Sequence, residues 1–66
     1  MRESFGYRLL MIRKQKDMAQ GELAEKIGIP QSQISRYEKG KLQPTITTLE
    51  WLCDALDVTA TELLGF

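Results

Sequence analysis

The 66-residue sequence contains no histidine and only one cysteine, Cys53. Without histidine the chain lacks the commonest general base, and a single thiol cannot complete a structural zinc site or an internal disulfide bond. The longest apolar run, Leu9–Ile12, has four residues, whereas a membrane span needs roughly 18–20. These absences argue against an enzyme, a metalloprotein and a membrane protein, and they favour a small binding module without a cofactor or a small-molecule ligand.

The chain also shows no sign of a boundary between domains or of a targeting signal. Two prolines and five glycines are scattered along it, and it has no repeat, linker or low-complexity segment. The first residues, MRESFGYRLL, contain no apolar stretch typical of a signal peptide. We therefore expect residues 1–66 to form one domain in the cytoplasm.

The charges are balanced in number but not in position. The first 41 residues hold nine basic and five acidic side chains, a net charge of +4, while the last 25 hold four acidic and no basic ones, a net charge of −4. A neutral protein with a basic front and an acidic back can bind a phosphate backbone on one side. The alternative is that both ends are ordinary solvated helix faces.

Apolar residues recur at helical spacing throughout, and no useful length shows the alternation of a strand. Leu49, Leu52, Cys53 and Leu56, for example, lie at i, i+3, i+4 and i+7. The spacing predicts an all-α chain of five helices, near residues 3–16, 20–27, 31–38, 46–56 and 60–64.

The second and third of these helices are separated only by Gly28, Ile29 and Pro30. Gly28 can adopt a positive φ and end one helix sharply, and Pro30 suits the entry to the next. So short a connection forces a steep angle between the helices, which is the helix-turn-helix arrangement. Ala24 is small where the helices must cross, and Ile34 can fill the inside of the corner.

The segment AQGELAEKIGIPQSQISRYEKGKLQP resembles the Cro and phage-repressor type of helix-turn-helix, the xenobiotic-response-element (XRE) class of regulators. FGYRLLMIRKQKDM is similar to the first helix of that family, and PTITTLEWLCDALDVTATELL to its fourth and fifth. The resemblance covers about residues 5–64. It implies a compact five-helix, lambda-repressor-like domain, encoded by a bacterium or phage and associated with the nucleoid.

The resemblance also implies a function. Its members are transcriptional regulators, here most simply a repressor, that bind a palindromic operator in double-stranded DNA as a homodimer, with helix 31–38 in the major groove. Two half-sites one turn apart would lie about 34 Å from centre to centre. The alternative from another class is a protein-interaction module or an antitoxin that uses the same fold.

The resemblance implies which residues of this chain contact DNA, by their match to the family's contact positions. Base contacts are expected from Gln31, Ser32, Arg36, Gln33 and Ser35. Phosphate contacts are expected from Gln20, Arg13, Lys39 and Lys41. Gln20 would also brace the first residue of the recognition helix, and Arg13 would form a structural ion pair with Glu38. Glutamine can bond adenine N6 and N7, and arginine can bond guanine O6 and N7.

Several of these residues have an ordinary alternative. Arg36 could instead pair with Glu22 or Glu25 on the neighbouring helix. Gln33 points partly toward that helix, and Lys39 and Lys41 could simply be solvated.

The chain departs from the family pattern at three positions. Ala19 stands where a capping serine or threonine is usual, although Glu22 remains at the reciprocal position of a capping box. Asp17 and Asp57 replace glycines that adopt the left-handed conformation, which aspartate tolerates better than most residues.

Three apolar residues fall where polar ones are expected: Leu10, Met11 and Trp51. Packing is the simpler interpretation for Leu10. Trp51 could be covered by the last helix or by Phe66, or it could join Val58 in a dimer contact. Cys53 is expected to be a small buried core residue.

Overall fold

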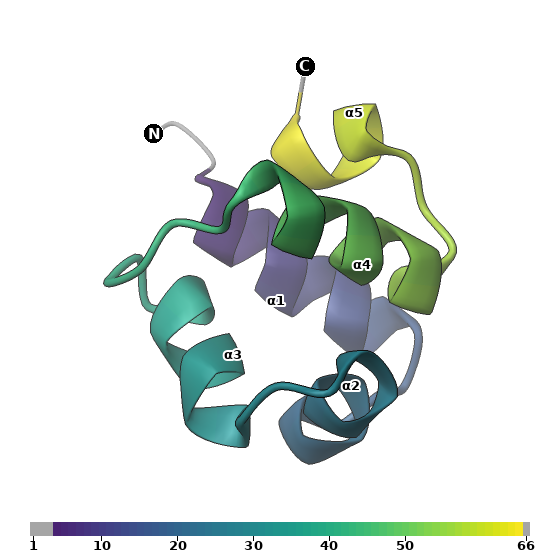
Figure 1. Ribbon diagram of the computed structural model, residues 1–66. Helices are drawn as coiled ribbons and strands as arrows, with labels where there is room; N and C mark the ends of the chain where they lie inside the picture. The colour runs from purple at the N-terminus through teal and green to yellow at the C-terminus, as the bar shows by residue number, and fades with distance from the viewer. Residues whose placement is uncertain (1–3, 66) are drawn as a thin grey trace.

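The computed structural model describes residues 4–65 (Figure 1). Side-chain caps mark the beginnings of three of its helices. Helix α1 (Phe5–Gln15) begins after Ser4, whose hydroxyl accepts a hydrogen bond from the Tyr7 N–H at 3.2 Å. This cap makes α1 shorter than the expected range 3–16. Thr45 and Thr59 cap α4 (Ile46–Leu56) and α5 (Ala60–Leu64) in the same way.

Helices α2 (Gln20–Ile27) and α3 (Gln31–Glu38) have the predicted bounds, as do α4 and α5. No strand occurs within residues 4–65, so the all-α prediction is confirmed for that part of the chain. Positive φ angles occur where they were expected, 78° at Gly28 and 56° and 57° at Asp17 and Asp57. The turns therefore have the left-handed conformation that the resemblance implied, although aspartate occupies two of these positions.

The core lies where the five helices meet. Nine apolar residues are buried: Leu9, Leu23, Ala24, Ile34, Tyr37, Leu52, Cys53, Leu56 and Leu63. Ala24 and Ile34 are 3% and 0% exposed, which agrees with their predicted places at the crossing of α2 and α3. Helix α3 also packs on α1, and α5 closes the core against α1 and α4. As expected, Cys53 is a buried core residue.

The backbones of α1 and α3 approach each other closely at Gly6. Gly6 is buried, and a Cβ there would overlap the carbonyl oxygen of Tyr37 and lie 2.9 Å from that of Glu38. The edge of the Phe5 ring meets Tyr37 beside it, with ring centroids 6.0 Å apart. Glycine at position 6 therefore sets how near α3 lies to α1. Among residues 4–65, none of the helices has the length and apolar character of a membrane span.

Candidate nucleic-acid interface

The side of α3 that faces away from the core carries unoccupied polar groups. Ser32 and Arg36 are exposed one turn apart, while Ile34 and Tyr37 face inward. Within residues 4–65 neither Ser32 nor Arg36 has a side-chain hydrogen bond, and the alternative pairing of Arg36 with a glutamate of α2 is not formed. A hydroxyl and a guanidinium thus remain available on one helix face.

Gln33 lies differently from that face. It is half-buried, and its Nε2 donates a hydrogen bond to the Tyr37 hydroxyl at 2.7 Å. One N–H of the Gln33 amide therefore serves a partner one turn along its own helix, and the base contact expected of Gln33 stays a prediction. Ser35 is also half-buried.

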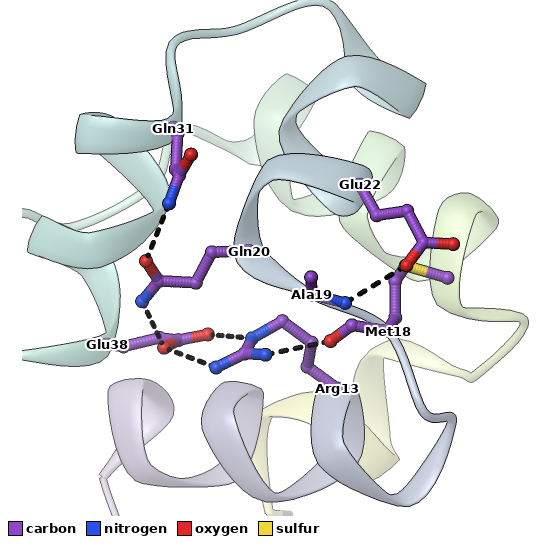
Figure 2. A network of polar contacts seen from close by, with 7 residues as sticks. All are labelled: Arg13, Met18, Ala19, Gln20, Glu22, Gln31 and Glu38. Carbon is purple, nitrogen blue, oxygen red and sulfur yellow. Dashed lines mark hydrogen bonds and ion pairs between the residues drawn. The ribbon is translucent and has the colours of Figure 1, made fainter.

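A buried ion pair ties the end of α3 to α1, as Figure 2 shows. Arg13 Nε lies 2.6 Å from Glu38 Oε2, and the two side chains are only 9% and 5% exposed. A second nitrogen of Arg13 donates to Glu38 Oε1 at 3.1 Å, and the third donates to the Met18 carbonyl at 2.8 Å. The pair expected between these residues is present, in bidentate form.

The same geometry bears on the second role expected of Arg13, the phosphate contact. All three guanidinium nitrogens are used within the protein, and the residue is 7% exposed. The structure therefore shows the structural role of Arg13, and the phosphate contact stays a prediction that only the small exposed part of the side chain could serve.

Gln20 links this ion pair to the start of α3. Its Nε2 donates to Glu38 Oε1 at 2.9 Å, and its Oε1 accepts a long hydrogen bond of 3.5 Å from Nε2 of Gln31 (Figure 2). The bracing of Gln31 by Gln20 is thus present. The link from Gln20 to Glu38 was not anticipated, because 18 residues separate them and no local pattern joins them.

The N-terminus of α2 lies beside this network. Ala19 offers no side-chain oxygen, and only the reciprocal half of a capping box exists, from the Ala19 N–H to Glu22 Oε1 at 3.2 Å. Among residues 4–65, the first-turn N–H groups of α2 therefore have no side-chain capping acceptor. Since the Gln20 amide is occupied on both sides, a phosphate contact at this position would use the backbone N–H groups and the positive end of the helix.

Lys39 and Lys41 flank the turn that leaves α3. Gly40 between them has a φ of 75°, and the N–H of Lys41 donates to the Arg36 carbonyl at 2.9 Å. Both lysines are exposed, and neither pairs with a carboxylate in the described chain. They extend the positive charge of Arg36 beyond the end of the helix.

Two of the three apolar residues that looked misplaced are exposed. Trp51 is 46% exposed and lines a surface hollow between α2 and α4, and Met11 is 40% exposed on α1. Leu10 and Val58 are half-buried, and Val58 packs against the core. Phe66, considered as a cover for Trp51, lies outside the described residues.

Comparison with known proteins places this geometry in a family. The family model described as helix-turn-helix matches residues 9–63. The immunity repressor protein of Bacillus phage phi105 is 32% identical over 60 residues, 91% of this chain and 42% of the repressor. The HTH-type transcriptional regulator y4dJ of Sinorhizobium fredii is 34% identical over 64 residues, 97% of this chain and 83% of the regulator. Antitoxin HipB of Escherichia coli is 37% identical over 51 residues, 77% of this chain and 58% of the antitoxin.

Solved structures of helix-turn-helix proteins have a similar fold. The restriction-modification controller protein C.AhdI from Aeromonas hydrophila matches with a TM-score of 0.87 and 32% identity over 91% of both chains. The P22 c2 repressor, solved in complex with a synthetic operator, matches with a TM-score of 0.89 and 27% identity over 96% of both chains. The chain thus spans less than half of the phage phi105 repressor but nearly all of these two solved chains.

Proposed function

The chain belongs to the XRE-type helix-turn-helix family of DNA-binding transcription regulators, and on this basis we propose that it represses transcription by binding a palindromic operator as a homodimer. In this proposal residues 1–66 act as one DNA-binding domain with α3 in the major groove. The observation that carries it is the outer face of α3, where exposed polar groups without a partner in the described chain stand beside the uncapped N-terminus of α2.

Base reading is assigned to the exposed residues of this face. The Gln31 amide can form two hydrogen bonds with adenine N6 and N7, and the Arg36 guanidinium can donate two to guanine O6 and N7. Ser32 is small enough to approach a base edge and can donate or accept. Ser35 and Gln33 are weaker candidates because both are half-buried, and one N–H of the Gln33 amide also donates to Tyr37.

Backbone binding is assigned to groups around that face. Lys39 and Lys41 supply mobile charges after the helix, and the first-turn N–H groups of α2 at Gln20 supply fixed donors. Such contacts hold the protein in register on the duplex and carry no sequence information.

Selection of binding sites from random DNA by the purified protein tests the proposal. We expect one two-fold symmetric motif with half-sites about 34 Å apart, bound by two chains. Recovery of an asymmetric motif bound by one chain would contradict the homodimer. Absence of any enriched motif would favour the protein-interaction alternative, which the similarity to Antitoxin HipB and the exposed Trp51 keep open.

A further inference from the structure

Gly21, in the first turn of α2, lies directly against the side chain of Gln31. A Cβ built at Gly21 would stand 3.1 Å from Gln31 Oε1 and 3.7 Å from its Cδ, and it would approach no other side chain of the described residues within 4 Å. The first distance is tighter than ordinary contact, so the Gln31 amide would have to move by a few tenths of an ångström. The absent side chain therefore leaves room for that amide.

Backbone geometry does not require a glycine here. Gly21 is helical and is not among the residues with positive φ, and glycine is a poorer helix former than alanine. Gly6 is different, because a Cβ there would meet backbone carbonyl groups. At Gly21 the neighbour is the flexible end of one side chain, so the fold can accept a methyl group.

Gln20 contacts the Gln31 amide from the other side, through a long hydrogen bond. Nε2 of Gln31 points toward Gln20 Oε1, and Gln20 is itself held by Glu38, while the Gln31 oxygen points away (Figure 2). One N–H of Gln31 is used in this bond. The oxygen and the second N–H remain, and these are the two groups that a bidentate contact with adenine requires.

We propose that Gly21 is a positioning residue that determines the base preference of Gln31 without contacting DNA. The inference rests on the proposed function, since it takes Gln31 to be a base-reading residue. Gly21 leaves open the location in which Nε2 of the Gln31 amide bonds Gln20 while the amide oxygen lies beside the first turn of α2. A methyl group at position 21 displaces that amide and spoils the bidentate geometry.

The free protein provides a first test that does not depend on DNA. In a Gly21→Ala variant we expect the side-chain amide NMR signals of Gln31 and Gln20 to shift, with a melting temperature equal to or above that of the parent chain. Thr61→Ala is the matched control, because Thr61 is an exposed residue at the second position of another helix, α5, which packs on α1 and α4. Unmoved Gln31 signals, or an unfolded Gly21→Ala protein, would overturn the inference.

Binding provides the second test, as a cycle of Gly21→Ala, Gln31→Ala and the double variant on the selected operator and on operators changed at single base pairs. A bidentate contact supplies roughly 5- to 150-fold discrimination. We expect Gly21→Ala to reduce discrimination about 5-fold or more at one base pair per half-site, and to have no such effect when Gln31 is already alanine.

The outcomes separate this inference from the function on which it rests. If the parent chain selects no motif, or if Gln31→Ala changes no base preference, the proposed function or its assignment of Gln31 is wrong. If both hold but Gly21→Ala leaves the preference intact, or alters it equally with and without Gln31, then the positioning role alone is overturned.

Discussion

At the scale of single residues, the proposed base contact and the proposed phosphate contacts come from differently placed side chains. Arg36 is exposed on the side of α3 that faces away from the core, whereas Lys39 and Lys41 follow the end of the helix. Because the helix positions Arg36 and only a turn positions the lysines, we expect Arg36 to affect base preference. We expect the two lysines to affect the affinity for all DNA through their charge.

Arg36→Ala should cost about 1–3 kcal/mol on the selected operator and relax the choice at one base pair per half-site. Lys41→Ala should weaken binding to all DNA nearly alike and flatten the plot of log affinity against log salt by about 0.9 for each phosphate that is no longer neutralised. The measurement is affinity for operator and scrambled DNA at several salt concentrations. Equal weakening of both DNAs by Arg36→Ala, with base preference unchanged, would make Arg36 a phosphate-binding residue.

The second residue-scale prediction concerns Glu38, which accepts from Arg13 and Gln20 together. Glu38→Gln leaves the buried Arg13 charge without its partner, and breaking a buried pair in this way costs about 3–5 kcal/mol. Denaturant unfolding measures the loss of stability. Glu50→Gln, an exposed acid on α4, is the control and should cost under about 1 kcal/mol. Similar losses of stability for both variants would show that the pair contributes little.

At the scale of elements, the spacing between α1 and α3 depends on one missing side chain. Gly6→Ala would drive a methyl group into the carbonyl groups of Tyr37 and Glu38, which cannot rotate away. We expect the helices to separate at a cost of about 1–3 kcal/mol, as for other overpacked sites. Thermal and denaturant unfolding would measure it, and Gly21→Ala is the contrasting variant that should keep its full stability. An unchanged midpoint for Gly6→Ala would refute the close approach.

Helix α5 depends on its cap. The Thr59 N–H donates to Glu62 Oε1 at 3.0 Å, and this backbone hydrogen bond is the main cause that lowers the pKa of Glu62 in the folded protein. A lowered pKa means that the carboxylate stabilises the fold above its unfolded pKa and loses that contribution as the pH falls through the folded pKa.

Glu62→Gln should therefore have a lower melting temperature than the parent chain at about pH 7, with the difference shrinking toward about pH 3 as the parent carboxylate becomes protonated. Melting curves of both proteins across this range test the cap. A difference that stays constant with pH would mean that the ionised form of Glu62 has no special role.

At the scale of the whole molecule, the net charge is zero, but the basic and acidic side chains lie on different parts of the chain. The basic groups Arg36, Lys39 and Lys41 lie on and after α3, while the four acids of the last 25 residues lie on α4, at its end and on α5. A duplex at α3 would meet positive charge with the acids placed on other elements. Binding should therefore be strongly salt-dependent although the protein is neutral.

Self-association is also a property of this scale. If Trp51 joins the dimer contact, Trp51→Ala should weaken pairing on the operator by about 2 kcal/mol or more, the effect typical of a buried interface tryptophan. Sedimentation with and without operator would follow the number of chains bound. Tyr7→Ala is the control, because Tyr7 on α1 is equally exposed at 46%. Two chains on a symmetric site for both variants, with equal affinity, would exclude Trp51 from the interface.

The helices of this protein follow from its sequence, because their causes are local. Apolar spacing predicts the five helices, and Gly28 and Pro30 predict the sharp corner between α2 and α3. The bounds of α1 alone differ from the expected range, because apolar spacing does not register the Ser4 cap. The outer polar face of α3 follows from the same periodicity, which is why Ser32 and Arg36 point away from the core as predicted.

The availability of the polar groups depends instead on tertiary packing. Arg13 and Gln33 belong to plausible contact patterns, yet one is buried against Glu38 and the other serves Tyr37. Gly6 and Gly21 look alike in the sequence, yet one faces backbone and the other a movable amide. Burial and contact depend on residues distant in the chain that packing brings together, and helical periodicity records only which side of its own helix a residue occupies.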